Sequence, residues 1–262
     1  MQAFAYQNPG SVADAAKAAS HSGAQFVAGG QSLLAAMKLG LAAPEALIDL
    51  GSIAELRGIT VSGGTVTIGA MTTHADVAAS KDVQKAIPAL AQLAGEIGDR
   101  QVRNRGTIGG SLANNDPAAD YPAAALGLGA TIQTNQRSIA ADDFFKGLYD
   151  TALKDGEVIT AVKFPVPEKA GWQKFKQPAS RFSTVGVFVS KGPAGTRVAV
   201  TGAKACVFRV SALESKLQAS WDAASCAGVF VSPADMTTDL HGSGEYRAAL
   251  VPVLAGRAVA AS

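Results

Sequence analysis

Two glycine-rich segments hold the residue types in this chain that most clearly suggest chemistry. The first is FVAGGQSL at residues 26–33, and the second is RGTIGGSL at residues 105–112. Glycine permits positive φ and close approach of the backbone to a ligand. Successive backbone N–H groups can then form an anion-binding nest. Two such turns in one chain favour one large anion held from two sides, for which a dinucleotide pyrophosphate is the natural candidate.

The competing interpretation is that each Gly-Gly pair is an ordinary turn. The chain contains 28 glycines, so some adjacent pairs arise by chance. Neither segment matches the G-x-G-x-x-G fingerprint or the G-x-x-x-x-G-K-[ST] P-loop, so both of those phosphate-binding motifs are disfavoured. The paired occurrence with matching flanks is what favours a binding role.

Composition excludes several classes of function. Hydrophobic residues make up 48% of the chain and charged residues only 17%, which suits a subunit that buries surface in a complex. The net charge of +2 gives no reason to expect a nucleic acid partner, and no apolar run predicts a transmembrane segment. The first six residues lack the pattern of a secretory signal.

The cysteine count points to a reducing compartment and to a chain without a metal site. Cys206 and Cys226 are the two cysteines, and they fit free thiols in the cytoplasm, where they are expected to be inert packing residues. Two cysteines cannot hold an iron–sulfur cluster alone. No set of Cys and His residues has the spacing of a zinc site.

Short helices and strands are expected to position the glycine segments. A strand at 25–28, a helix at 33–39 and a strand at 47–50 form a small unit around the first segment, and the basic residues 100–105 are expected to be a loop before the second. The clearest boundary is PVPEKAG at 165–171, which is rich in proline, glycine and charge. The other predicted helices are 11–22, 73–80, 87–97, 121–128, 141–145, 211–219 and 246–261, and the other strands are 65–70, 131–134, 158–165, 172–176, 185–190 and 197–202.

Three ordered stretches resemble a known family. AGGQSLLAAMK, IGAMTTHADVAAS and VRNRGTIGGSLANNDPAADYPAA, with KFKQPASRFSTVGV and HGSGEYRAAL in the tail, are similar to the FAD-binding medium subunit of the molybdenum hydroxylases. That group includes carbon monoxide dehydrogenase, xanthine dehydrogenase and bacterial aldehyde and N-heterocycle dehydrogenases. The resemblance covers essentially the whole chain.

The resemblance implies an α+β fold: a two-subdomain FAD-binding domain of the vanillyl-alcohol-oxidase type, followed by a small α+β C-terminal domain. The expected divisions are 1–57, 58–168 and 169–262. It also implies partners: a large molybdopterin subunit, and a small subunit with two 2Fe–2S clusters, assembled as a dimer of heterotrimers. This chain would take electrons from the clusters onto non-covalent FAD and pass them to an external acceptor, without oxidising the organic substrate alone.

The resemblance also implies site residues. The two glycine segments would wrap the pyrophosphate, Asp120 would accept hydrogen bonds from ribityl or ribose hydroxyls, Lys176 would lie near the flavin ring, and Ile159 would pack on the flavin or adenine. The expected cofactor-binding residues are Val27, Ala28, Gly29, Gly30, Gln31, Ser32, Leu33, Thr107, Ile108, Gly109, Gly110, Ser111, Asn114, Asp120, Ile159 and Lys176.

Several residues keep a second interpretation. Asp120 and Asp116 are also plausible helix caps, Lys176 a solvated strand lysine, and Ile159 a core residue. His74 is expected to be structural rather than a covalent attachment point.

Phe182 matches a position where some relatives place an aromatic residue over the flavin. Arg103 and Arg105 could steer the cofactor, face the iron–sulfur partner or serve only the loop. Two other functions stay open: a self-contained flavin-dependent oxidoreductase of the same fold, and a non-catalytic assembly subunit.

Overall fold

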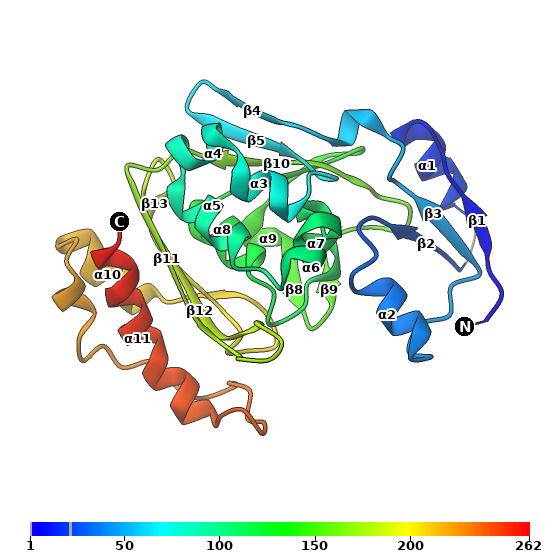
Figure 1. The fold of residues 1–262 in the computed structure, drawn as a ribbon. Helices are drawn as coiled ribbons and strands as arrows, with labels where there is room; N and C mark the ends of the chain where they lie inside the picture. The colour runs from blue at the N-terminus through cyan, green and yellow to red at the C-terminus, as the bar shows by residue number, and fades with distance from the viewer. Residues whose placement is uncertain (1, 21–22) are drawn as a thin grey trace.

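Three β-sheets of three or more strands follow one another along the chain in this computed structural model, which describes residues 2–20 and 23–262. They lie side by side, with the N-terminus at one end of the molecule and the C-terminus at the other (Figure 1). The predicted helix at 11–22 appears as α1 (Val12–Ala18), and residues 21 and 22 of the prediction lie outside the described residues.

The first sheet is small and parallel. Its strands are β1 (Ala5–Gln7), β3 (Ala46–Asp49) and β2 (Ala24–Val27), in that spatial order. Between β2 and β3 the chain passes through the first glycine segment and α2 (Leu33–Lys38), so the predicted strand–turn–helix–strand unit is confirmed. A parallel pair needs such a crossover connection.

The second sheet has five strands joined by antiparallel pairing. In spatial order they are β4 (Ile59–Ser62), β5 (Thr65–Gly69), β10 (Ile159–Pro165), β6 (Thr131–Thr134) and β7 (Ser138–Ala140). A two-stranded hairpin, β8 (Phe145–Gly147) with β9 (Asp150–Thr151), precedes β10. The central position of β10 explains its buried Val162 and Phe164.

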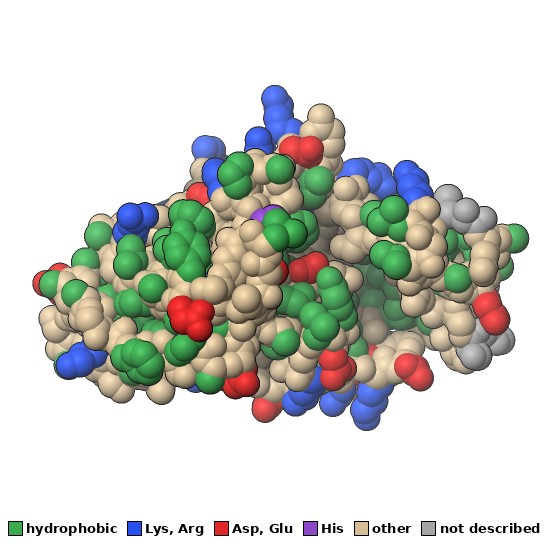
Figure 2. All heavy atoms as spheres, turned by 90° about the horizontal axis from the view of Figure 1, so that it is seen from below, with side chains coloured by type: hydrophobic (Ala, Val, Ile, Leu, Met, Phe, Trp, Pro, Cys, Tyr) green, Lys and Arg blue, Asp and Glu red, His purple; other side chains and the backbone are tan. Residues whose placement is uncertain are grey.

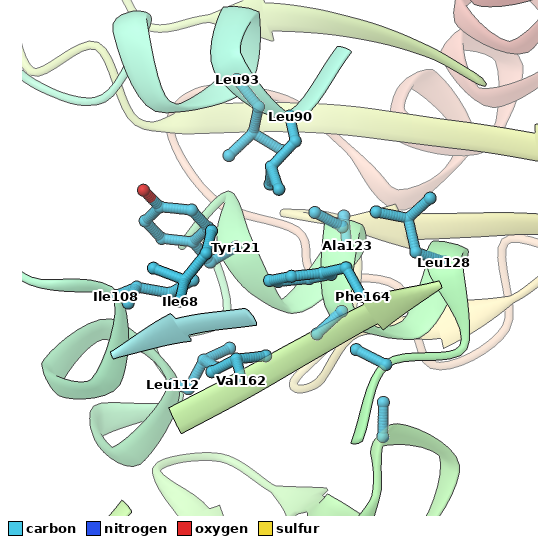
Figure 3. Packing of buried hydrophobic residues seen from close by; sticks show 14 of the residues in the cluster. Ile68, Leu90, Leu93, Ile108, Leu112, Tyr121, Ala123, Leu128, Val162 and Phe164 are labelled. Atoms are coloured by element: carbon cyan, nitrogen blue, oxygen red, sulfur yellow. The ribbon is translucent and has the colours of Figure 1, made fainter. Parts of the chain in front are cut away.

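Short helices pack against this sheet and enclose the main core. They are α3 (His74–Ala79), α4 (Lys81–Ala86), α5 (Pro88–Gly95), α6 (Arg100–Arg105), α7 (Ile108–Asn114), α8 (Tyr121–Leu128) and α9 (Ala141–Phe144). Figure 3 shows Leu90, Tyr121 and Phe164 converging in this core. Every residue of α8 is buried, because the helix lies between the second sheet and the third.

The third sheet separates two apolar cores. Its strands are β11 (Lys169–Lys176), β12 (Ser183–Gly192), β13 (Gly195–Thr201) and β14 (Phe208–Arg209). On β12, Val185, Val187 and Val189 face α10 (Ser211–Ala219) and α11 (Gly244–Ala260), while Phe188 joins the core around α8. Alternate residues of a strand point to opposite faces, so helices cover both faces of this sheet.

The predicted mixture of helix and strand is confirmed, with local differences. Residues 100–105 form a helix instead of the predicted loop, because Asp99 caps its first turn by accepting from Val102 N. The predicted boundary at 165–171 shrinks to residues 166–168, since β11 already begins at Lys169. The division into 1–57, 58–168 and 169–262 stays a prediction. Trp172 belongs to the third of these parts but packs in the main core with residues of the second.

Candidate functional site

A cavity of about 510 Å³ lies where the three parts of the chain meet. The face drawn in Figure 2 is hollowed between the N-terminal part and the centre of the molecule. The wall of the cavity combines the first glycine segment, residues from the second glycine segment to Asp120, Ile159 at the start of β10, and Lys174 of β11. A cavity of this volume falls within the usual range for small-molecule and cofactor sites.

The first glycine segment forms a tight loop between β2 and α2. Gly30 has φ of +72°, which L side chains rarely adopt. Gly29 lies against the backbone of Arg105 and Gly106, and a Cβ on it would be 2.1 Å from the carbonyl oxygen of Arg105. Both glycines are therefore required by geometry, one for its backbone angle and the other for a close approach between two backbone segments.

This loop presents open hydrogen-bond donors. Within residues 2–20 and 23–262, no atom accepts from the backbone N–H of Gly29, Gly30, Gln31 or Ser32. All four residues line the cavity. Consecutive unpaired N–H groups are a favourable setting for an anion, so this loop fits a phosphate group.

The second glycine segment is a helix start rather than a free turn. Gly109 and Gly110 lie in α7, and Thr107 is its N-cap. Ile108 N donates to Thr72 O at 3.2 Å, Gly109 N to Ala70 O at 2.9 Å, and Gly110 N to Thr107 Oγ1 at 3.2 Å. The expected second nest of free N–H groups is therefore wrong for these three donors. Gly109 instead allows close packing, because its Cβ would be 2.6 Å from that of Ala70.

A buried ion pair stands in the wall of the same cavity. Lys174 Nζ lies 2.5 Å from Asp120 Oδ2, and the two side chains are 1% and 4% exposed. Ser183 Oγ donates to Asp120 Oδ1 at 2.7 Å. Burial raises the pKa of Asp120, while Lys174 and Ser183 act to lower it. Asp120 occupies the N-cap position of α8, but its side chain makes no cap hydrogen bond and accepts from Lys174 and Ser183 instead.

The structure places Lys174 in the cavity wall and Lys176 outside it. Lys176 is exposed. In a regular strand residues i and i+2 share a face, but the register between β11 and β12 shifts between Phe175 and Lys176. The expected proximity of Lys176 to the flavin stays a prediction, and the lysine that the fold brings to Asp120 is Lys174.

Thirteen of the sixteen expected cofactor-binding residues line this one cavity, and three do not. Val27 and Ile108 are buried in apolar cores, and Lys176 is exposed. The lining residues among those expected are Ala28, Gly29, Gly30, Gln31, Ser32, Leu33, Thr107, Gly109, Gly110, Ser111, Asn114, Asp120 and Ile159. Their roles toward a cofactor stay predictions.

Residues outside that set also line the cavity. Asp116 and Phe182 do so, and Phe182 is half exposed, whereas Arg103 and Arg105 do not. Lys174 and Arg181 were missed by sequence reasoning. The alternating K-F-K of residues 174–176 was the available signal for Lys174, since residues i and i+2 of a regular strand share a face and an inward Lys176 predicts an inward Lys174.

His74 is a buried histidine against the cavity. Its ring packs on Tyr121, with the ring centroids 5.3 Å apart, and no described group partners its Nδ1. Burial, assisted by the charge of Arg103, lowers the pKa of His74 to about 4, so the ring is neutral at pH 7. Gly106 makes room for it, because a Cβ there would lie 2.5 Å from Nε2. These contacts agree with a structural role.

Neither a membrane-spanning helix nor a metal-binding cluster is found among residues 2–20 and 23–262. None of their helices combines the length and apolarity that crossing a bilayer requires. No three His, Cys, Asp or Glu side chains within these ranges come together as metal ligands.

Comparison with known proteins agrees with this geometry. Residues 2–167 match a family model described as the FAD binding domain in molybdopterin dehydrogenase. The chain is 37% identical to the carbon monoxide dehydrogenase medium chain of Hydrogenophaga pseudoflava, with 99% of this chain and 96% of that one covered. It is 36% identical to the nicotine 6-hydroxylase medium subunit of Paenarthrobacter nicotinovorans, with 99% and 97% covered.

Solved structures give the same result for the fold. Reconstituted CO dehydrogenase from Oligotropha carboxidovorans superposes with a TM-score of 0.91 at 31% identity, covering 99% of this chain and 97% of that chain. The enzyme of Hydrogenophaga pseudoflava that lacks the Mo-pyranopterin moiety gives 0.87 at 35% identity, with the same coverage. Fold and cavity therefore define an FAD-binding protein of mixed helix and sheet. The chain belongs to the family of FAD-binding medium subunits of molybdenum hydroxylase-type complexes.

The cavity fits FAD by the chemistry of its wall. The open N–H groups of the first glycine loop suit the pyrophosphate, and the carboxylate of Asp120 suits hydroxyl groups. Apolar side chains of Ile97, Leu153 and Ile159 offer a surface for a flat ring. The same cavity therefore combines donors for the pyrophosphate, an acceptor for hydroxyl groups and an apolar surface for a ring.

Proposed function

We propose that this chain is the FAD-carrying electron-transfer subunit of a molybdenum hydroxylase complex. The observation that carries the proposal is the row of open backbone N–H groups from Gly29 to Ser32 in the wall of the cavity. The cofactor is held without a covalent bond, and when bound it supplies the redox chemistry. The protein supplies binding, orientation and electrostatics.

The residues of the chain divide this work among them. The first glycine loop holds the pyrophosphate through its N–H groups, and Ser111 and Asn114 add side-chain hydrogen bonds from α7. Asp120 accepts from hydroxyl groups of the cofactor, and Ile159 packs against a ring. Phe182, half exposed at the end of the β11–β12 connection, covers the ring from outside.

The partners of the chain follow from the same proposal. A large molybdopterin subunit oxidises the substrate, and a small subunit carries the 2Fe–2S clusters that deliver electrons to this chain. The complex is a dimer of heterotrimers in the cytoplasm, and an external acceptor takes the electrons away. The names of two relatives, a medium chain and a medium subunit, support a complex with further subunits. The chain alone does not oxidise the organic substrate.

A visible absorption spectrum of the tagged chain, purified from its native host, tests the proposal. Flavin bands together with broad iron–sulfur absorption are expected, and trichloroacetic acid should release the flavin from the precipitated protein. Flavin bands alone, with turnover of a small substrate by the isolated chain, would favour a self-contained oxidoreductase instead. No flavin, and none regained on adding FAD, would leave an assembly subunit.

A further inference from the structure

The ion pair between Asp120 and Lys174 joins two regions of the chain at the cavity wall. Asp120 lies inside the segment matched by the FAD-binding family model, residues 2–167. Both of its side-chain partners lie beyond that segment: Lys174 on β11 and Ser183 on β12. The third sheet therefore contributes to the site through groups that an FAD-binding domain ending at residue 167 would not contain.

We propose that Lys174 is a positioning residue of the cofactor site, holding Asp120 as an oriented carboxylate that accepts hydrogen bonds from the hydroxyl groups of FAD. This inference rests on the proposed function and assigns the residue that prepares Asp120 for it. A carboxylate has about four acceptor positions. Lys174 and Ser183 occupy two of them, one on each oxygen, which fixes the plane of the group and leaves acceptor positions for the ligand.

The surroundings of Lys174 indicate that it is held for this task. Its Nζ also donates to the carbonyl oxygen of Glu96 at 3.3 Å, directly after α5. Trp172, two residues earlier on β11, donates from Nε1 to Glu96 Oε2 at 3.2 Å. The ammonium group is thus fixed between β11, the end of α5 and the start of α8.

Stability alone is a poor reason for such a pair. Removing two charges from water costs several kcal/mol per ion, and apolar replacements of buried pairs are often neutral or stabilising. Here both members line a cavity that fits a ligand rich in hydroxyl groups. A role in the bound state is therefore the reason that we assign to this buried pair.

Removal of Lys174 has a defined electrostatic consequence. The groups that act on Asp120 are Lys174, Ser183 and the carboxylate of Glu96, and Tyr121 follows it in the chain. Without the cation, burial and Glu96 remain to raise the pKa of Asp120, and only the hydrogen bond from Ser183 acts to lower it. The pKa of Asp120 would therefore rise further in the variant, and FAD binding would improve as the pH rises and the carboxyl group ionises.

The experiment is titration of FAD into the full-length apoprotein, followed by quenching of flavin fluorescence between about pH 6 and pH 9. The variants are K174M, K174R, S183A, D120N and the double variant K174M/D120N. Lys163→Met is the matched control, because Lys163 is an exposed strand lysine outside the cavity wall. Lys176→Met tests the competing assignment from the family resemblance.

K174M should weaken FAD binding by about tenfold or more at pH 7 and show a steeper gain in affinity with pH than wild type. K174R should restore most of the affinity. In the D120N background, K174M should change affinity by less than about twofold, because the two residues act as a unit. S183A should cause a smaller loss in the same direction, and it carries the test if K174M does not fold.

Two results would overturn the inference. One is wild-type affinity and pH dependence in K174M or, where that variant does not fold, in S183A. The other is a pH-dependent loss in K176M with none in K174M, which would return the role to Lys176. Failure of the proposed function is distinguishable, because wild-type protein and K163M would then also fail to bind FAD.

Discussion

Replacement of Gly29 by alanine tests the geometry of the first glycine loop most directly. The added Cβ would lie 2.1 Å from the carbonyl oxygen of Arg105 and 2.8 Å from the Cα of Gly106, whereas ordinary contact begins at 3.4 Å. Both obstacles are backbone atoms, so no side chain can rotate away. One of the two segments must retreat by about 1 Å, and such overpacking costs about 1–3 kcal/mol of folding stability.

The retreat also carries the open N–H groups away from the bound anion. A hydrogen bond to a charged group contributes about 1.5–3 kcal/mol. Since 1.4 kcal/mol corresponds to tenfold in affinity, loss of one such bond should raise the Kd for FAD by about 10- to 100-fold. The assay is fluorescence titration of FAD into the apoprotein, with urea unfolding of the same samples to measure stability.

Gly10→Ala is the matched control for this experiment. No heavy atom lies within 4 Å of a Cβ on Gly10, and its φ is not in the positive region, so affinity and stability should match wild type. If G29A bound FAD within about twofold of wild type, the assignment of the loop to the pyrophosphate would be refuted. If it lost stability but not affinity, the contact would be structural only.

Two further predictions concern buried polar residues, His74 and Asn115. Burial lowers the pKa of His74 to about 4 from 6.5, so between these pH values the unfolded chain binds a proton that the folded chain does not. The free energy of unfolding should therefore fall as the pH drops from about 6.5 to 4. Urea unfolding of H74L should lack this part of the decline, and an unchanged decline would contradict the buried neutral ring. Asn115 has φ of 44° and donates from Nδ2 to Gly147 O and Asp150 O. N115A should therefore lose about 1–2 kcal/mol more stability than N115G, which keeps the left-handed angle at no cost; equal losses in thermal unfolding would show that the angle carries no strain.

Elements with strong local signals were predictable from the sequence. The helix at 121–128 was predicted from its apolar residues, and both ends are correct. In the structure Pro122 lies in its first turn, and Gly129, at φ of +62°, ends it. The helix at 211–219 and the strand at 131–134 were also found with the observed bounds. Local residue chemistry sufficed in each case.

Elements decided by tertiary contacts were not predictable in the same way. Glycine disfavours a helix interior, so residues 109 and 110 indicated a turn. They are helical because Gly109 packs against Ala70 and Thr107 caps the helix. The basic residues of α6 showed no apolar period, and none of them is buried. Its helix depends on the cap at Asp99, a single residue.

The candidate site shows the same difference between features set by local residues and features set by tertiary contacts. Glycine pairs and their hydroxyl neighbours could be read from spacing, and most of them share the cavity. The sequence could not tell that the N–H groups of Ile108 and Gly109 are already used, because their acceptors lie on Thr72 and Ala70, far away in the sequence. It also could not choose between Lys174 and Lys176, since the register shift that separates them arises from pairing with β12.

The distance along the chain between Asp120 and its partners sets an order of events during synthesis. Lys174 follows Asp120 by 54 residues and Ser183 follows it by 63. A ribosome must therefore complete the second sheet and enter the third before the carboxylate meets either group. Domains generally fold in order as they emerge. A nascent chain that stalls before residue 174 would carry the first glycine loop and an unsupported Asp120, so full affinity for FAD is expected only late in translation.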